Sequence, residues 1–318
     1  MFIKFFYLFF FIKNISCLAI SKNNFNFLHS KWDGKKFDTL IFEGGGVRAV
    51  VYSGGIKKLE DDNILNDISN IAGTSSGAQT AALLCVGYSS KELICALKNA
   101  PWNKILNRNI FNIKYLYFLL AKFGLNNSKY LEIYLDDLIY KKTGIKKITF
   151  KDLYNKTNIH LKVGVCSLTN QEFKYIDHNS YPDMPVSTGL VASSSIPFIF
   201  TATKWRNELF VDGGLVGNLP VTAFPNSNCL AFTLLSDNEF CSKGNPKNIF
   251  GFVKTVLNIL FRNLQSFYSS KNDCIKNVDY IQINTDDIGV LDTNLSNETI
   301  ENLIDHGYKA VEHFLDSK

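Results

Sequence analysis

Residues 68–86 read ISNIAGTSSGAQTAALLCV, and this stretch gives the clearest indication of the fold. Residues 68–72 are predicted to form a strand, and the small and apolar residues at the other end of the stretch are typical of a helix. Between them stands the pattern G-x-S-x-G, in which Gly73 and Gly77 flank Ser75. The two glycines allow a sharp strand-to-helix turn that projects the serine hydroxyl beyond the sheet edge. We therefore predict that Ser75 is a nucleophile.

A serine hydroxyl is a poor nucleophile at neutral pH and needs a neighbouring base to take its proton. The motif Asp212-Gly213-Gly214 follows a short predicted strand at Leu209–Val211. Most such triplets are turns in which the aspartate caps the backbone. A carboxylate can also act as the base when burial makes it more basic. We predict that Asp212 accepts the Ser75 proton.

A third motif, Gly44-Gly45-Gly46-Val47-Arg48, follows a predicted strand at Thr39–Phe42. Attack on an ester creates an oxyanion, which needs preorganised hydrogen-bond donors. Successive glycines let backbone N–H groups converge without obstruction from side chains. This loop is therefore predicted to bind the oxyanion.

The same loop fits a second pattern, G-x-G-x-x-A at Gly44, Gly46 and Ala49, which is a dinucleotide-binding fingerprint. That fingerprint requires an acidic residue at the end of the next strand. Residues 60–62 are acidic but end the predicted helix, and the next strand ends in the serine turn. The nucleotide interpretation is therefore the weaker one.

Histidine is the alternative base. The order Ser…Asp…His of the α/β-hydrolases allows Asp212 to pair with His306 or His313. Both lie in a predicted amphipathic helix near the C-terminus, where a solvated role is more common. A third possibility is a catalytically silent lipid- or protein-binding module that has kept the fold, although the intact Ser75 and Asp212 count against it.

The three motifs, in this order, resemble those of the patatin-like phospholipases, a family related to the catalytic domain of cytosolic phospholipase A2. Two further stretches are similar to family signatures, at 192–197 (ASSSIP) and at 212–220, where Asp212 leads to Asn218-Leu219-Pro220. The resemblance extends from about Phe37 to Leu235. One departure is Ala49, where the family usually has glycine, and a methyl group there could shift the loop.

The resemblance implies a three-layer α/β/α domain with a mostly parallel central sheet, acting as a lipid acyl hydrolase of the phospholipase A type. It implies a Ser75–Asp212 dyad, an acyl-serine intermediate, and an oxyanion hole built from the Gly44–Gly46 amides with Arg48 beside them. No metal or cofactor is implied. The expected partners are phospholipid or another acyl lipid and a membrane surface, and the serines at 193–195 are expected to be structural.

The composition agrees with a globular enzyme, since 46% of the 318 residues are hydrophobic and 20% are charged. The net charge of +5 is mild and scattered, so nucleic acid is a poor candidate partner. The sequence contains no C-x-x-C pair, which argues against a zinc site. The seven cysteines are expected to be mostly buried free thiols. The oligomeric state cannot be inferred from the sequence.

The expected elements alternate between strand and helix around the three motifs, which favours an α/β domain with a mostly parallel sheet. The aromatic and basic region from Trp102 to Tyr130, with Lys104, Arg108 and Lys114, is a candidate lipid-docking surface, or else part of the core. The other expected elements are helices at 47–60, 76–86, 248–268 and 297–315, mainly helix over 90–142, and strands at 161–165, 229–235 and 280–283.

The N-terminus differs from the rest of the chain. Residues 5–12 read FFYLFFFI, which is too short to span about 30 Å of hydrocarbon. We expect residues 1–20 to be a signal peptide with Ala19 as its cleavage residue, or an interfacial membrane anchor. The alternative is an apolar N-terminal segment that packs on the domain. Residues 21–36 are polar and form a predicted linker to one acyl hydrolase domain at 37–318, whose core motifs lie within 39–235. The expected location is a membrane or the secretory pathway, with the cytoplasm as the alternative.

Overall fold

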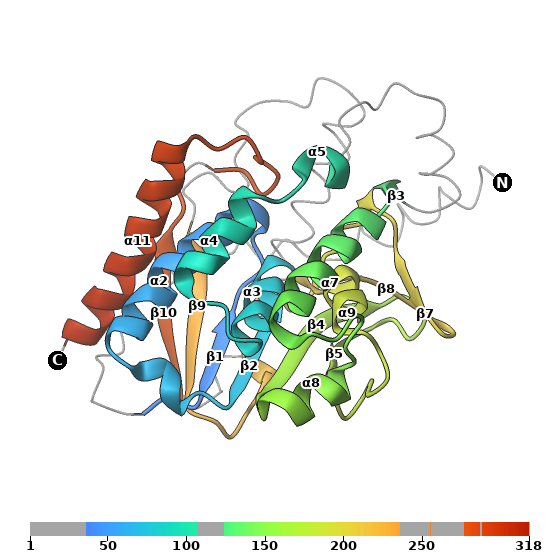
Figure 1. Cartoon of the computed structure of the whole chain (residues 1–318), viewed down its shortest axis with the longest axis horizontal. Helices are drawn as coiled ribbons and strands as arrows, with labels where there is room; N and C mark the ends of the chain where they lie inside the picture. Colours follow the sequence, from blue (N-terminus) through green and yellow to red (C-terminus); the bar gives the residue numbers. More distant parts are fainter. Residues whose placement is uncertain (1–35, 107–123, 236–254, 256–276, 287, 318) are drawn as a thin grey trace, which may run out of the picture. The chain divides into compact units, whose positions relative to one another are not determined.

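A mixed β-sheet with mostly parallel strands forms the centre of the computed structural model, which describes residues 36–106, 124–235, 255, 277–286 and 288–317 (Figure 1). The five strands from β10 to β4 are parallel; β8 and β5 each pair antiparallel with β4, and β7 pairs antiparallel with β8. In sheet order the strands are β10 (Val278–Asn284), β9 (Cys229–Leu235), β1 (Thr39–Phe42), β2 (Asn70–Thr74), β4 (His160–Ser167), β8 (Glu208–Asp212) and β7 (Thr203–Trp205). Strand β5 (Glu172–Ile176) also pairs with β4. Strands β3 (Gly124–Asn126) and β6 (Phe198–Phe200) form a separate sheet.

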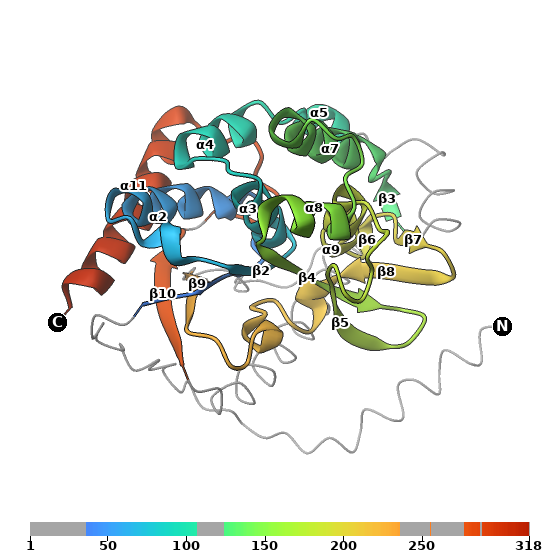
Figure 2. The ribbon, with the colours of Figure 1, turned by 60° about the horizontal axis from the view of Figure 1, so that its bottom comes forward.

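Helices flank the sheet, and Figure 2 shows α2, α3, α4 and α11 over the same face. The main apolar core lies beneath them. A smaller cluster, which includes Ile41, Ala72 and Phe224, packs on the opposite face with a short 3-10 helix. The helical elements are η2 (Gly46–Ala49), α2 (Val50–Asp61), η3 (Ile64–Asp67), α3 (Ser76–Cys85), α4 (Ser90–Lys98), α5 (Trp102–Ile105), α7 (Lys129–Thr143), α8 (Phe150–Thr157), α9 (Val186–Ser193), η4 (Gly213–Leu215), η5 (Val221–Ala223) and α11 (Asn297–Asp316).

Glycines allow α2 and α11 to pack closely. A Cβ atom on Gly54 would lie 1.8 Å from the Ile304 carbonyl oxygen, and one on Gly307 would lie 1.9 Å from the Val51 carbonyl oxygen. Both distances are far below van der Waals contact, so only glycine fits at either position. A glycine in the middle of a helix costs roughly 0.5–1 kcal/mol relative to alanine, and here the close helix contact explains it.

The predicted α/β class and the mostly parallel sheet are confirmed, with small shifts at element ends. Strand β2 begins and ends two residues later than predicted, and the helix predicted from Val47 begins with the 3-10 turn η2. The sequence analysis missed α8, β5 and α9. The helix predicted at 248–268 lies outside the described residues apart from Thr255.

Strand register brings the sequence motifs to one level of the sheet. Strands β1 and β2 are parallel neighbours, so the glycine loop and Ser75 both follow carboxyl ends at the same edge. Thr74 pairs with Gly164 on β4, and the next β4 residue, Val165, pairs with Asp212 on β8. Because β8 runs antiparallel to β4, its last residue reaches the level of Ser75 from the other side of β4.

The N-terminal predictions fall on residues 1–35, which lie outside the described residues, so they stay predictions. Within the described residues, no helix combines the length and the apolar character needed to cross a bilayer. Of the four cysteines in the described ranges, all are free thiols; Cys85, Cys166 and Cys229 are buried, and Cys95 is exposed.

Candidate active site

Ser75 lies between β2 and α3 in a strained backbone conformation, with φ 53° and ψ −125°. A positive φ is uncommon for a residue with a side chain and marks a tight, over-determined turn. A Cβ on Gly73 would lie 2.4 Å from the Gly77 carbonyl, and one on Gly77 would lie 2.4 Å from the Phe42 carbonyl oxygen. Both flanking glycines are therefore required by space, as a nucleophile elbow demands.

The Ser75 hydroxyl donates a hydrogen bond directly to Asp212, with 2.7 Å between Oγ and Oδ2. Both residues are buried, with 8% of Ser75 and 5% of Asp212 exposed. The other carboxylate oxygen, Oδ1, accepts the Gly214 N–H at 2.7 Å. Gly213 must be glycine, because a Cβ there would lie 2.4 Å from the Gly164 carbonyl oxygen. The D-G-G turn thus aims one carboxylate oxygen at the serine.

Burial raises the pKa of Asp212 to about 6, although the hydrogen bonds from Ser75 and from the Gly214 amide lower it in part. Desolvation disfavours the charged form, and hydrogen bonds to the carboxylate favour it. A base with a pKa of about 6 is ionised at neutral pH and still has appreciable proton affinity. The carboxylate is therefore poised for proton transfer with Ser75.

The three amides of the glycine loop differ in their partners. The Gly44 N–H donates to the Asn218 carbonyl at 3.2 Å, and the Gly45 N–H donates to the Ser76 hydroxyl at 3.0 Å. Among the described residues no acceptor lies within hydrogen-bonding distance of the Gly46 amide, and Gly46 lines the same pocket as Ser75. The Gly46 amide is therefore well placed to donate to an oxyanion. The Gly45 amide can do the same by exchanging the Ser76 hydroxyl for the oxyanion, whereas the Gly44 amide is held by a backbone carbonyl.

Arg48 lies behind this loop and is 2% exposed. Its Nε donates to the Gly45 carbonyl at 3.2 Å, and the residue does not line the pocket that contains Ser75. Arg48 therefore holds the loop in place from its buried side. Ala49 has φ −57°, which any residue adopts, so its methyl group imposes no backbone strain on the loop.

The segment between β10 and α11 packs directly on the glycine loop. The Val47 N–H donates to the Val290 carbonyl at 3.1 Å. Gly46 has φ +59°, and a Cβ on it would lie 2.0 Å from the Val290 carbonyl oxygen. Only glycine satisfies both the positive φ and this close approach.

Two of the serines that were expected to be structural, Ser193 and Ser195, hold the elbow and Asp212 in register. The Ser193 hydroxyl accepts the Ser75 N–H at 2.8 Å and donates to the Gly164 carbonyl at 2.6 Å. The Asp212 N–H donates to the Ser195 carbonyl at 3.0 Å. The expected structural role of these serines is thus specific: they connect α9 to both members of the Ser–Asp pair.

Asn218 connects the D-G-G segment to the glycine loop. The side-chain Nδ2 of Asn218 donates to the Gly44 carbonyl and to Glu43 Oε1, each at 3.0 Å, and the backbone carbonyl of Asn218 accepts the Gly44 N–H. The second carboxylate oxygen of Glu43 accepts the Leu234 N–H at 2.8 Å. The only sequence signal for Asn218 was its place in the stretch from Asp212 to Pro220.

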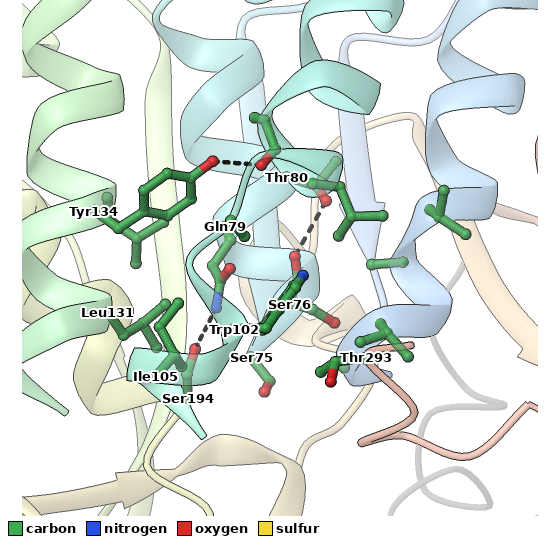
Figure 3. A pocket seen from close by; sticks show the side chains of 18 of the residues that line it. Ser75, Ser76, Gln79, Thr80, Trp102, Ile105, Leu131, Tyr134, Ser194 and Thr293 are labelled. Atoms are coloured by element: carbon green, nitrogen blue, oxygen red, sulfur yellow. Dashed lines mark hydrogen bonds between the residues drawn. The ribbon is translucent and has the colours of Figure 1, made fainter. Parts of the chain in front are cut away.

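An apolar pocket opens beside the serine (Figure 3). Helices α3, α4, α5 and α7 supply about half of its wall, and the polar residues Ser75, Ser76, Gln79 and Ser194 gather on one part of it. Such a pocket suits the hydrocarbon chain of an acyl group. Its apolar lining includes Leu83, Leu93, Trp102, Leu131, Leu135 and Ile196.

Neither candidate histidine contacts the Ser–Asp pair. His306 lies on α11 with Nδ1 3.3 Å from the Asn284 carbonyl oxygen, and His313 is in the last turn of that helix. Within the described residues no histidine is hydrogen-bonded to Asp212 or lines the pocket. The described residues also hold no cluster of three potential metal ligands. The expectation of a reaction without metal or cofactor stays a prediction.

The candidate lipid-docking region is only partly within the described residues, since 107–123 lie outside them. Trp102 lines the pocket, whereas Tyr130 on α7 is 51% exposed. Lys104 belongs to α5, and Arg108 and Lys114 fall in the range that is not described. The interpretation as a docking surface stays a prediction.

The sequence pattern of the patatin-like phospholipases matches residues 40–225, which is more than half of the chain and includes the glycine loop, Ser75 and Asp212. The chain belongs to this family. The patatin-like chain is 28% identical over 280 residues to the uncharacterized protein R571 of Acanthamoeba polyphaga mimivirus, covering 86% of this chain and 91% of that protein. It is 29% identical over 187 residues to the probable lipid hydrolase 463L of Invertebrate iridescent virus 6, covering 59% and 63%.

Solved structures show the same fold at lower identity. VipD from Legionella pneumophila matches with a TM-score of 0.59 and 16% identity, over 91% of this chain and 69% of VipD. The type III effector ExoU of Pseudomonas aeruginosa matches with a TM-score of 0.51 and 14% identity, over 88% of this chain and 53% of ExoU. The chain therefore spans about half of the ExoU chain. Family membership and the viral relative together identify the protein as a hydrolase.

Proposed function

We propose that this patatin-like protein hydrolyses acyl esters of phospholipids, as a phospholipase A-type enzyme, through a Ser75–Asp212 dyad. The observation that carries the proposal is the direct 2.7 Å hydrogen bond between the two buried side chains. A carboxylate in this position can take the serine proton without an intervening histidine.

In the first half of the reaction, Asp212 accepts the hydroxyl proton while Ser75 Oγ attacks the ester carbonyl carbon. The Gly45 and Gly46 amides donate hydrogen bonds to the oxyanion of the tetrahedral intermediate. The protonated Asp212 then gives its proton to the departing alcohol oxygen. The fatty acyl group stays on Ser75 as an ester, with its hydrocarbon chain in the apolar pocket.

In the second half, a water molecule takes the place of the departed alcohol. Asp212, again a carboxylate, accepts a proton from this water as its oxygen attacks the acyl carbon. Collapse of the second tetrahedral intermediate breaks the bond to Ser75 Oγ, which recovers the proton from Asp212 and releases the fatty acid. The dyad returns to its starting state, and the site needs no other proton carrier.

The substrate class is supported by the pocket and by the family. A pocket with mainly apolar walls stabilises a hydrocarbon chain by roughly 0.8 kcal/mol for each buried CH₂ group. Lipids with such chains are held in bilayers or micelles, so the enzyme would act at a membrane surface. The probable lipid hydrolase 463L supports the same substrate class.

The test is hydrolysis of defined phospholipid vesicles by wild-type protein, Ser75→Ala and Asp212→Asn. Both variants should lose activity by at least about a thousandfold, because Ser75 and Asp212 act together in one proton transfer and the loss of either residue stops it. The matched controls are Ser69→Ala and Asp183→Asn, which change exposed residues outside the site.

A fluorophosphonate probe should label wild-type protein, and mass spectrometry should place the adduct on Ser75. Labelling that persists in Ser75→Ala, or activity that persists in Asp212→Asn but is lost in His306→Ala, would contradict the dyad. An unlabelled, inactive wild-type protein that still binds vesicles would instead indicate the silent binding module.

A further inference from the structure

A hydrogen-bonded pair, Gln79 and Ser194, interrupts the apolar wall of the pocket (Figure 3). Gln79 is one helical turn beyond the serine on α3, since its N–H donates to the Ser75 carbonyl at 3.1 Å. Its side-chain Nε2 donates to Ser194 Oγ at 2.9 Å. Ser194 follows α9 and is 6% exposed. The pair therefore lies on the pocket wall close to the reacting serine.

Each member of the pair has a hydrogen-bonding capacity that no other described residue uses. Ser194 Oγ accepts from Gln79, and no described acceptor lies within reach of its own proton. Gln79 donates through its amide nitrogen, and its carbonyl oxygen Oε1 has no donor among the described residues. The neighbouring serines differ in this respect, because Ser193 and Ser195 each donate to a backbone carbonyl.

An unused donor and an unused acceptor become unfavourable once a substrate displaces water from an apolar pocket, because each is then left without a hydrogen-bond partner. A plain hydrocarbon chain cannot satisfy either group. A hydroxyl can satisfy both at once, since it donates one hydrogen bond and accepts another. The pair offers the complementary set, with an acceptor at Gln79 Oε1 and a donor at the Ser194 hydroxyl.

We propose that Gln79 and Ser194 form a polar subsite that binds a free hydroxyl of the lipid substrate, within a few bonds of the scissile ester carbonyl. This inference rests on the proposed function and adds the substrate class to it. Gln79 lies four residues after Ser75, which is about 6 Å along the helix at 1.5 Å for each residue. The short separation keeps the recognised hydroxyl near the ester.

Two kinds of acyl lipid carry such a hydroxyl. In monoacyl lipids, such as a lysophospholipid, it is the free glycerol hydroxyl next to the ester. In hydroxylated acyl esters it is on the acyl chain near the carbonyl. The chemistry that the pair recognises is the same, so the two sources are separated by substrate pairs that differ only in that group.

The experiment measures kcat/KM for two such pairs. One pair is lysophosphatidylcholine and its analogue that lacks the free glycerol hydroxyl. The other is para-nitrophenyl decanoate and its β-hydroxy derivative. Wild-type protein should prefer the hydroxylated member of one pair by about tenfold, as expected when one good hydrogen-bonding group is matched. The pair that shows the preference identifies the source of the hydroxyl.

The variants are Gln79→Met, which keeps the side-chain length, and Ser194→Ala. Each should bring the preference ratio close to one, and the double variant should show no further change because both residues bind the same hydroxyl. The exposed residues Ser69 and Gln171 provide controls as Ser69→Ala and Gln171→Met, which should keep the wild-type ratio. A ratio is independent of how much of a variant is folded.

No preference in either pair for wild-type protein would overturn the subsite. A preference that survives both substitutions would also overturn it, since the pair would then serve only to connect α3 and α9. The proposed function fails in a different way: Ser75→Ala would keep its activity, or wild-type protein would hydrolyse none of the four substrates, and the subsite would fall with it.

Discussion

Replacing Asp212 by asparagine should make the folded protein more stable at alkaline pH while it abolishes hydrolysis. Burial raises the pKa of the Asp212 carboxyl to about 6, from an ordinary value of 3.8. The folded protein therefore binds this proton more tightly than the unfolded chain does. The stabilisation from that proton is complete below the unfolded pKa and is lost as pH rises through 6. Above pH 6 the folded state holds a buried charge that asparagine lacks.

The magnitude follows from the difference of about 2 pKa units, at 1.36 kcal/mol for each unit. At pH 8 the charged carboxylate costs the folded state about 3 kcal/mol, and at pH 4 under about 1 kcal/mol. An asparagine can keep the hydrogen bond from the Gly214 N–H through its carbonyl oxygen. Any change in packing or hydrogen bonding caused by the amide should be nearly independent of pH. The gain in stability should therefore grow by about 2 kcal/mol between pH 4 and pH 8.

Urea unfolding of wild-type protein and Asp212→Asn at the two pH values measures this difference directly. Asp177→Asn is the matched control, because its effect on the free energy of unfolding should have the opposite sign. Burial acts to raise the pKa of Asp177, but hydrogen bonds from His160 and Ser180 outweigh it and hold the pKa well below its usual range. That variant should be destabilised at pH 8 and by nearly as much at pH 4, because the stabilisation from a lowered pKa is lost only as pH falls through that pKa. A stability difference for Asp212→Asn that is negative at pH 8, or the same at both pH values, would refute the reasoning.

The same geometry leads to three further predictions. Wild-type kcat/KM for a soluble ester should fall about tenfold for each pH unit below about 6 and level off above it, because Asp212 must be ionised to act as a base. A flat pH profile from pH 5 to 8 would argue against Asp212 as the base. Gly77→Ala should lower kcat by about a hundredfold, because its Cβ would lie 2.4 Å from the Phe42 carbonyl oxygen and displace the elbow. In Gly87→Ala the Cβ would meet no atom within 4 Å, but φ there is +84°, so this control should lose some stability and keep kcat; equal losses of kcat would contradict the steric argument. Deleting residues 1–30 should preserve hydrolysis of a soluble ester and change where the protein resides in cells, as fluorescence microscopy of a tagged protein would show; unfolding of the shortened protein would refute the targeting role.

Local chemistry explains the parts of the fold that the sequence predicted. Strands β1 and β9 are short, apolar and buried on both faces, so a continuous hydrophobic run identifies them. Helix α9 was missed because its sequence, VSTGLVAS, is rich in residues with low helix propensity. Seven of its eight residues are buried, so tertiary packing stabilises it. Strand β5 was missed because it is mostly half-buried, with a mixture of charged and aromatic residues.

Short-range patterns in the sequence specify which residues reach the site. The glycines set the turns around Ser75 and Asp212, because a Cβ atom would collide with neighbouring backbone at Gly73, Gly77 and Gly213. Such turns depend on a few adjacent residues, and for that reason the amino-acid sequence alone is enough to recognise them.

How those residues act together depends on the tertiary structure. The contact between Ser75 and Asp212 requires the register of two strands on either side of β4, one parallel and one antiparallel to it. The raised pKa of Asp212 depends on burial by distant segments, and the use of the Gly44 amide by Asn218 joins residues 174 positions apart. These properties arise from long-range packing and desolvation, and no local pattern of residues encodes them.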